Sequence, residues 1–293
     1  MAWTLPTVSV TANRMSAITR FAPSPTGYLH LGHAHAALFA RRAAGTSGRF
    51  LLRLEDIDPG RGDPAFAAAI FEDLGWLGLT WESPVRRQSA HMADYAAAVA
   101  RLQDMGLLYP CFCTRRDIRA EIARSGQAPH APDGPLYPGT CKRLDPGQRQ
   151  ERLAAGDGHA LRLDVAAAAA RAGPLSWHDR DRGMQTAAPR LFGDVVLARK
   201  EVATSYHLAV TVDDALQGIT LVTRGEDLFA ATHVHRLLQA LLDLPEPEWQ
   251  HHRLLADTDG KRLAKRSNAQ AIRFLRAAGH SPADVRTLAG FPD

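Results

Sequence analysis

The feature that most constrains the fold is the segment RFAPSPTGYLHLGHAH, which spans residues 20–35. An apolar strand at residues 17–21 leads into a turn rich in proline and glycine, and a helix begins near residue 31. The start of this helix carries His30, Gly32 and His33. A strand that turns directly into a helix places backbone N–H groups where a phosphate can bind, and the helix dipole favours the negative charge. The segment therefore predicts nucleotide chemistry.

The apolar pattern that follows predicts a parallel sheet with crossover helices. A second short strand is expected at residues 51–54, and residues 64–77 and 95–108 have helical spacing. Periodicity is then lost in a Pro/Gly-dense region that holds all three cysteines, and a second loop is expected at residues 173–189. Alternating strands and helices of this kind are typical of an α/β fold.

A regular pattern resumes near residue 194 and includes a helix expected at residues 228–242. The simplest architecture is one Rossmann-like parallel sheet built in two halves, with an insertion between them and a short helical C-terminal region. We therefore expect a disordered tail at residues 1–15, a first half at 16–109, an insertion at 110–190, a second half at 191–256 and a basic loop with a helical tail at 257–293.

Composition narrows the class of protein. The chain has 293 residues, with 35 Lys and Arg against 31 Asp and Glu, a balance that mildly favours a polyanionic partner such as RNA. An Arg-rich solvated surface explains the same balance equally well. No apolar run approaches the roughly 20 residues that span a bilayer, so no membrane association is expected. Three cysteines, two of them in a Cys-x-Cys pair, argue against a secreted disulfide scaffold and favour a cytoplasmic enzyme.

Two segments together indicate an enzyme family. RFAPSPTGYLHLGHAH resembles the HIGH-motif segment of class I aminoacyl-tRNA synthetases, specifically of their glutamyl branch. A second basic loop, RLAKR at residues 262–266, resembles the KMSKS loop of the same family; taken alone it is more often a charged surface turn. The resemblance implies the fold of a class I synthetase and an ATP site. Magnesium would accompany ATP as cosubstrate.

The resemblance assigns catalytic roles to three side chains, His30, His33 and Lys265. The two histidines, with the backbone around Gly32, would bind the phosphates of ATP during amino-acid activation, with the largest gain in the transition state. Lys265 matches the second lysine of the KMSKS motif. Arg262 stands where the first lysine is usual, and Ala264 where serine is usual, so the loop keeps its charge.

The resemblance also outlines a glutamate pocket. Its members would be Arg20, Ser24, Glu55, Tyr206 and Arg224. Arginines that grip carboxylates and a glutamate that receives the α-ammonium suit a dicarboxylic amino acid. Any one of these residues taken singly could instead form a structural ion pair, for example Glu55 with Arg53 or Arg20. Val210 departs from the family, because many full-length glutamyl enzymes carry a polar asparagine there.

The cysteines predict a metal site. Cys111, Cys113 and Cys141 supply three soft ligands, whereas zinc usually takes four in a tetrahedral arrangement. The resemblance implies Tyr137 as the fourth ligand, and coordination chemistry alone leaves His130 as a competitor. One structural zinc would then stabilise the insertion. Three inert thiols are the alternative.

The length of chain beyond the basic loop indicates which group of a tRNA accepts the activated glutamate. Residues 267–293 are too few for an anticodon-reading domain of even about 50 residues. A glutamyl-like enzyme of this size with this insertion resembles the glutamyl-queuosine tRNA(Asp) synthetases. That family activates glutamate without requiring tRNA and esterifies it to the queuosine base at the wobble position of tRNA(Asp). On this interpretation the catalytic domain approaches the anticodon loop of tRNA(Asp), and we expect the protein to be a monomer.

Two other functions remain open from the sequence. One is a glutamyl- or glutaminyl-tRNA synthetase that charges a tRNA 3′ end and lacks or borrows its anticodon domain. The other is a non-catalytic RNA-binding paralogue, which the presence of His30, His33 and Lys265 disfavours.

Overall fold

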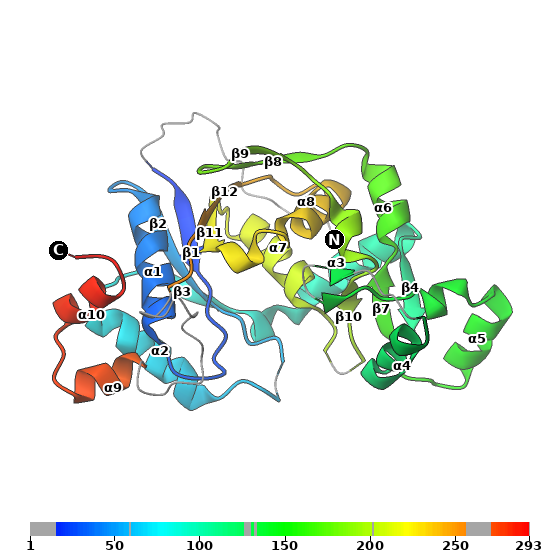
Figure 1. Ribbon diagram of the computed structural model, residues 1–293, viewed down its shortest axis with the longest axis horizontal. Coiled ribbons are helices and arrows are strands. Elements are labelled where there is room, and N and C mark those ends of the chain that lie inside the picture. The colour runs from blue at the N-terminus through cyan, green and yellow to red at the C-terminus, as the bar shows by residue number, and fades with distance from the viewer. Residues whose placement is uncertain are drawn as a thin grey trace.

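The computed structural model describes residues 16–58, 60–125, 130–131, 134–200, 202–255 and 271–292, without the side chains of 122–125, 130–131 and 135. The expected tail at residues 1–15 and the basic loop with Arg262 and Lys265 lie outside this described part, as does the side chain of His130. Figure 1 shows the two halves of the α/β fold to the left and centre and the insertion to the right.

The first half alternates strands and helices as the pattern predicts. It contains β1 (Ile18–Phe21), α1 (Leu31–Ala44), β2 (Arg49–Leu54), α2 (Pro64–Trp76) and β3 (Glu82–Arg87). β2 lies between β1 and β3 and pairs with both in parallel. α2 begins where Asp63 caps the backbone N–H of Ala65 and Pro64 occupies the first turn, a position where its missing N–H costs nothing. The strands predicted at residues 17–21 and 51–54 and the helices that begin near residues 31 and 64 are confirmed. The helix predicted at residues 95–108 ends at Asp104, because Gly106 takes a positive φ of 69° and a strand begins at Leu108.

The second half completes the parallel sheet. β11 (Leu221–Gly225), β12 (Glu248–His252) and β8 (Ser176–Asp179) are parallel neighbours, and β9 (Gly183–Thr186) adds an antiparallel edge. β11 lies beside β1, where Thr220 donates its backbone N–H to the carbonyl of Ile18 at 3.0 Å. Helix α7 (Tyr206–Leu216) precedes β11, and η4 (Glu226–Leu228) and helix α8 (Thr232–Leu241) follow it.

The loop predicted at residues 173–189 is wrong, because it contains the β8–β9 hairpin. Charged residues surround its tight turn, and Gly183 takes a positive φ of 70°, so the sequence there has the composition of a loop. The strand is nevertheless fixed by Trp177 and Asp179, which are both fully buried. This hairpin contributes to the candidate active site, because Asp179 on β8 is one of the residues of that site.

The insertion is an antiparallel three-stranded unit of β4 (Leu108–Cys111), β7 (Ala160–Leu163) and β10 (Val196–Ala198). Its helices and short elements are α4 (Arg115–Ser125), β5 (His130–Ala131), β6 (Gly134–Pro135), η2 (Thr140–Arg143), α5 (Pro146–Ala154), α6 (Val165–Ala172) and η3 (Pro189–Phe192). The absence of periodicity predicted between residues 110 and 146 is wrong at α4. This helix, RRDIRAEIARS, is largely polar, so it has no apolar stripe to reveal it.

Two of the remaining helices pack against helices of the two halves. η1 (Gln88–His91) and α3 (Met92–Asp104) follow β3, and α9 (Ile272–Ala277) and α10 (Pro282–Leu288) form the C-terminal region. Helix α3 packs against α7, and α10 packs against α1. The expected short helical C-terminal region is confirmed by α9 and α10. Within the described part of the chain, no helix is both long enough and apolar enough to cross a membrane.

Candidate active site

The predicted phosphate-binding histidines cap the first helix. The Nδ1 atom of His30 accepts a hydrogen bond from the backbone N–H of Gly32 at 3.1 Å. The Nδ1 atom of His33 accepts the backbone N–H of His30 at 3.2 Å, which makes a reciprocal capping box. Because Nδ1 is the acceptor in both rings, each neutral imidazole carries its proton on Nε2. Two N–H donors at a helix start suit the oxyanions of a phosphate.

Close packing explains the glycine between the two histidines. A Cβ atom on Gly32 would lie 3.0 Å from Cε1 of His30, which is tighter than ordinary side-chain contact. The centroids of the His30 and His33 rings are only 3.9 Å apart. A larger residue at position 32 would therefore push the His30 ring away from the helix start.

The chain that follows the basic loop is fastened beside these histidines. It re-enters the described part of the structure at Ala271, which forms an antiparallel β-bridge with His30. Ile272 then donates its backbone N–H to the carbonyl of Leu29 at 2.8 Å. The chain that follows the second motif is therefore held against the first motif by these two backbone contacts, whereas residues 256–270 lie outside the described part.

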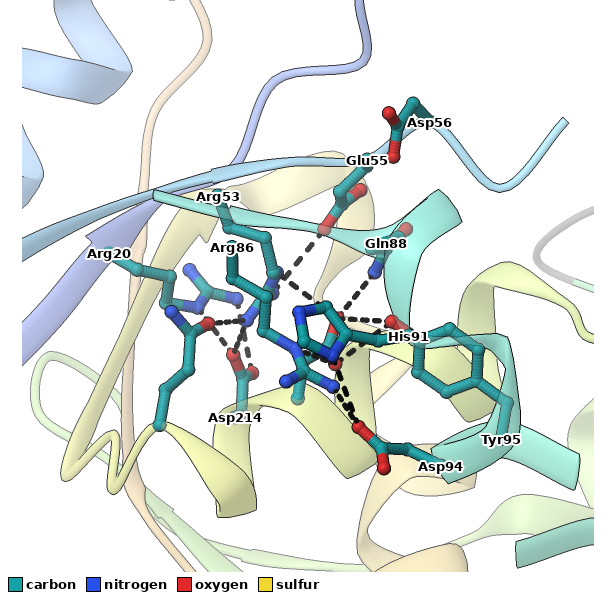
Figure 2. Close-up of polar contacts among 12 residues, drawn as sticks. Arg20, Arg53, Glu55, Asp56, Arg86, Gln88, His91, Asp94, Tyr95 and Asp214 are labelled. Atoms are coloured by element: carbon teal, nitrogen blue, oxygen red, sulfur yellow. Dashed lines mark hydrogen bonds and ion pairs between the residues drawn. The ribbon is translucent and has the colours of Figure 1, made fainter. Parts of the chain in front are cut away.

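A buried ion network connects the strands of the first half to helix α7 (Figure 2). Arg20 donates from Nε to Oδ1 of Asp214 at 2.8 Å and from Nη2 to Oδ2 at 3.3 Å. Arg53 donates from Nη1 to the same Oδ1 at 2.8 Å. Burial by itself raises the pKa of Asp214, but the charges of Arg20 and Arg53 outweigh it and hold this pKa below its usual value. Arg20 is thus held in one orientation by a bidentate ion pair.

Glu55 lies at the edge of the network. Its Oε1 atom is 3.4 Å from Nη2 of Arg53, and 12% of its side chain is exposed. Burial raises the pKa of Glu55 above its usual value, although Arg53 and Arg20 oppose the shift. A carboxylate whose desolvation is only partly compensated gains from a further cation, so this position suits a bound ammonium group.

Asp213 connects helix α7 to three neighbouring elements. Its fully buried carboxylate accepts hydrogen bonds from Nε of Arg86 at 2.7 Å, from Nε2 of Gln88 at 2.8 Å and from the hydroxyl of Tyr95 at 2.9 Å. These donors come from β3, η1 and α3. Two adjacent aspartates on α7 therefore fix the position of a helix that begins with Tyr206.

Arg224 has a different environment, because its partners are uncharged. Its guanidinium donates to Nε2 of His251 at 3.1 Å, to Nδ1 of His235 at 3.0 Å and to the hydroxyl of Thr232 at 2.6 Å. Burial lowers the pKa of Arg224, which shows that desolvation of its charge is incompletely offset. A buried arginine held by neutral acceptors is well suited to a ligand carboxylate.

The donors of Arg224 set the tautomers of the surrounding histidines. Since a guanidinium can only donate, His251 carries its proton on Nδ1 and gives it to Asp179 at 2.7 Å. His235 likewise carries its proton on Nε2 and donates to Nδ1 of His207 at 3.1 Å. Burial and the charge of Arg224 lower the pKa of His207 to about 4 and that of His251 to about 4. These rings are therefore neutral at physiological pH.

The neutral histidines predict acid sensitivity. Their pKa values lie near 6.5 in the unfolded chain and about 4 when folded, so the unfolded state takes up protons first as pH falls. The free energy of unfolding should be greatest above about pH 6.5 and should fall between there and about pH 4, by up to about 1.4 kcal/mol per pH unit for each histidine. Urea unfolding at about pH 7.5 and about pH 5 measures this slope. Replacement His207→Gln should make the slope shallower; an identical slope in wild type and variant would contradict the assignment.

The structure brings most of the predicted glutamate pocket together around Tyr206. Burial raises the pKa of Tyr206, and the charges of Arg224, Glu55 and Arg20 all act on its hydroxyl. Val210, the position that departs from the family, is buried one turn further along the same helix. Ser24 is exposed in the turn after β1, where its carbonyl accepts the backbone N–H of Thr26 at 2.9 Å.

The three cysteines lie together, as predicted. Their Sγ atoms are all within 4.8 Å of one another, and those of Cys113 and Cys141 are 3.4 Å apart. Tetrahedral coordination with bonds of about 2.3 Å would separate sulfur atoms by roughly 3.8 Å, so the cluster fits a metal ion. The hydroxyl of Tyr137 is 3.6 Å from Sγ of Cys113 and accepts the backbone N–H of Cys141 at 2.8 Å. These donors could hold a soft divalent cation.

Comparison with known proteins places this geometry in a family. The family described as "tRNA synthetases class I (E and Q), catalytic domain" matches residues 16–289. This chain belongs to the E and Q family of class I tRNA synthetases. Among its curated relatives, the Glutamyl-Q tRNA(Asp) synthetase of Rhodobacter capsulatus is 53% identical over 93% of this chain and 99% of that protein. The protein of the same name from Symbiobacterium thermophilum is 43% identical over 91% of this chain and 83% of that protein.

Longer relatives share the same catalytic fold. A crystal structure of a glutamate tRNA ligase from Elizabethkingia meningosepticum, in complex with its amino acid, superposes with a TM-score of 0.70 at 26% identity. That alignment covers 90% of this chain but only 53% of the ligase, so this class I synthetase spans about half the length of the solved enzyme. The predicted class I α/β fold is therefore confirmed.

Several residues of this class I synthetase site were not predicted from the sequence. They are Asp179, Asp213, Asp214, His207, His235 and His251. A signal existed for two of them, because consecutive aspartates inside an otherwise apolar helical pattern require buried cationic partners. The histidines carry no such signal, since a single histidine in a helix or strand is usually structural.

Proposed function

We propose that this chain activates glutamate with ATP, without requiring tRNA, and transfers the glutamyl group to the queuosine base at the wobble position of tRNA(Asp). The observation that carries the first step is a group of fixed charges around Tyr206: Arg20 is held by Asp214, Glu55 lies beside Arg53, and Arg224 is held by neutral acceptors. The acceptor is supported by the relatives named Glutamyl-Q tRNA(Asp) synthetase, which match nearly the whole chain.

The pocket residues divide the substrate between them. Arg224 binds a glutamate carboxylate, because its charge is buried among neutral acceptors. Glu55 receives the α-ammonium, and Tyr206 lies between the two. Arg20, which is held by Asp214, and Ser24, in the exposed turn after β1, would hold the carboxylate and amino groups of the substrate. Opposite charges at the two ends would select a dicarboxylic amino acid.

The proposed reaction has two steps. In the first, a carboxylate oxygen of glutamate attacks the α-phosphorus of ATP and pyrophosphate leaves, which yields glutamyl-adenylate. In the second, a hydroxyl oxygen of the acceptor attacks the glutamyl carbonyl carbon, the bond to AMP breaks, and the hydroxyl proton passes to water. His30, His33 and the backbone at Gly32 stabilise the phosphate charge in the first step.

The second ATP-binding segment completes this site. Arg262 and Lys265 would neutralise the phosphates together with Mg²⁺. The anchoring of Ala271 on His30 supports this, because it holds the end of their loop next to the histidines. We also place the protein in the cytoplasm as a monomer whose nucleic-acid partner is the anticodon loop of tRNA(Asp).

The cysteine cluster holds one structural zinc ion in this proposal. Cys111, Cys113 and Cys141 supply three thiolates, and Tyr137 supplies the fourth ligand. The backbone N–H of Phe112 donates to Sγ of Cys141 at 3.3 Å, which stabilises charge on a ligating sulfur. Bound zinc supplies a cross-link between β4 and η2 and takes no part in the chemistry.

Replacement Tyr137→Phe should weaken zinc binding while leaving one equivalent bound at saturating metal. The loss of one of four ligands should raise the dissociation constant for zinc about 10- to 100-fold, the range observed when a residue that supports a metal ligand is replaced. Chelator competition followed by metal analysis measures the change. Tyr109→Phe, in strand β4 near the cysteine cluster, is a matched control. An unchanged affinity would reject Tyr137 as a ligand and favour His130 or water.

Pyrophosphate exchange tests the activation step. With glutamate and ATP but no tRNA, the protein should incorporate labelled pyrophosphate into ATP, and aspartate or glutamine should support exchange at least about 10-fold less well. A double variant at the two histidines, His30→Ala with His33→Ala, should abolish exchange. Absence of glutamate-dependent exchange in the wild-type protein would reject the enzymatic function.

A further inference from the structure

A cavity next to the glutamate pocket has no role in the activation step. Its volume is about 330 Å³, and one wall is formed by Ser205, Tyr206 and His207 at the start of α7. The opposite wall comes from the insertion and includes Tyr137 and Arg162. Ligand pockets usually fall in the range of about 300–1,000 Å³, so this cavity has room for one small group and not for a length of RNA strand.

Tyr206 belongs to both the cavity and the glutamate pocket. Its hydroxyl responds to the charges of Arg20, Glu55 and Arg224, while the residue also lines the cavity. A ligand in the cavity would therefore lie beside activated glutamate. We infer that this cavity binds the acceptor nucleoside, as a single base unstacked from an RNA loop, and that Arg199 at the cavity wall contacts its phosphate backbone. The inference rests on the proposed function and extends it to named acceptor-binding residues.

The cavity walls have the chemistry that unstacked bases require. Tyr137, Tyr206, His207 and Phe192 provide aromatic rings, and proteins commonly hold splayed-out bases against such rings. Arg162 is fixed as a planar wall, because its guanidinium lies 3.9 Å from the Tyr137 ring centroid and donates to the carbonyl of Asp194 at 2.7 Å. A fixed guanidinium plane is itself a stacking surface for a base.

The charges of the cavity favour an anionic ligand. The carboxylate of Asp194 accepts the hydroxyl of Tyr109 at 2.7 Å and lies 3.2 Å from the ammonium of Lys142, so its charge is already balanced. Arg162 and Arg199 both line the cavity, and Arg199 is exposed. An exposed arginine beside a base-sized cavity is placed to meet the phosphates that flank an inserted base.

A second cavity provides a matched comparison. It is larger, about 600 Å³, and is lined mostly by alanine, proline and leucine together with the exposed Arg190. None of the predicted site residues in the described part of the chain lines it. Charge reversal at Arg190 changes the net charge exactly as reversal at Arg199 does, so a general loss of attraction to RNA would affect both variants equally.

The test compares Arg199→Glu with Arg190→Glu in the full chain, using two assays. Exchange without tRNA reports activation, and transfer of labelled glutamate to queuosine-containing tRNA(Asp) reports acceptor use. Arg199→Glu should lower kcat/KM for tRNA at least about 10-fold, a size typical of a lost charged contact, and leave exchange within about 2-fold. Arg190→Glu should change neither assay by more than about 2-fold. Equal effects of the two variants on transfer, or no effect of Arg199→Glu, would overturn the inference.

A steric variant tests the cavity independently of charge. Val196→Trp places a large ring in the lining and should block transfer while thermal unfolding confirms that the protein is folded. Retained transfer in a folded Val196→Trp protein would overturn the inference. Failure of the proposed function has a different outcome: wild-type protein would then ignore queuosine and require the 3′-terminal adenosine of a tRNA. A tRNA that lacks this adenosine should remain a full acceptor if the inserted base is queuosine.

Discussion

Replacement of Asp214 by asparagine should destabilise the fold by about 3 to 5 kcal/mol, the cost of removing one partner from a buried ion pair. Asp214 is the acceptor for both Arg20 and Arg53, whose guanidiniums are buried. Without the carboxylate, Arg20 loses its ion-pair partner and Arg53 keeps the longer ion-pair contacts with Glu55 at 3.4 Å and Asp213 at 3.6 Å. The free energy of unfolding from urea titration measures the effect.

A matched control separates burial from charge. Asp94 pairs with Arg86 in the same network, but 37% of its side chain is exposed. Asp94→Asn should therefore cost less than about 1 kcal/mol, as exposed ion pairs do. If Asp214→Asn cost no more than Asp94→Asn, the buried network would not hold the two halves together.

Arg224→Lys should raise KM for glutamate in the exchange assay about 10- to 100-fold. The substitution keeps the charge but removes the planar fork that contacts His251, His235 and Thr232 at once. Loss of a charge-assisted contact to a carboxylate costs about 1.5–3 kcal/mol, which corresponds to that range. Because Arg224 has no assigned contact with ATP, KM for ATP should stay within about 2-fold.

Arg180→Lys is the matched control for this prediction. Arg180 lies on the β8–β9 hairpin and pairs with Glu248 at 2.7 Å in a partly exposed position. Its replacement should leave both KM values unchanged, since exposed pairs contribute little. A normal KM for glutamate in a folded Arg224→Lys protein would remove Arg224 from the substrate pocket.

Local patterns predicted the elements on which the site is built. The turn after β1 and the helix start with His30 and His33 follow from residues 20–35, because each feature depends on neighbours a few positions apart. The grouping of Cys111, Cys113 and Cys141 was also predictable, since soft ligands of one type in one insertion have few other uses.

Long-range pairing was not predictable from the same information. Arg20 and Asp214 are 194 positions apart, and no spacing in the sequence indicates that they meet. Arg20 was predicted to hold substrate, whereas its guanidinium makes a bidentate pair with a protein carboxylate. The histidines around Arg224 come from α7, α8 and β12, so only the fold reveals them as one group.

Transfer of labelled glutamate to tRNA(Asp) tests the central claim most directly. We predict that tRNA(Asp) containing queuosine becomes labelled, that it is still labelled when it lacks its 3′-terminal adenosine, and that tRNA(Asp) without queuosine remains unlabelled. Equal labelling with and without queuosine, or labelling confined to the 3′ end of tRNA(Glu), would contradict it.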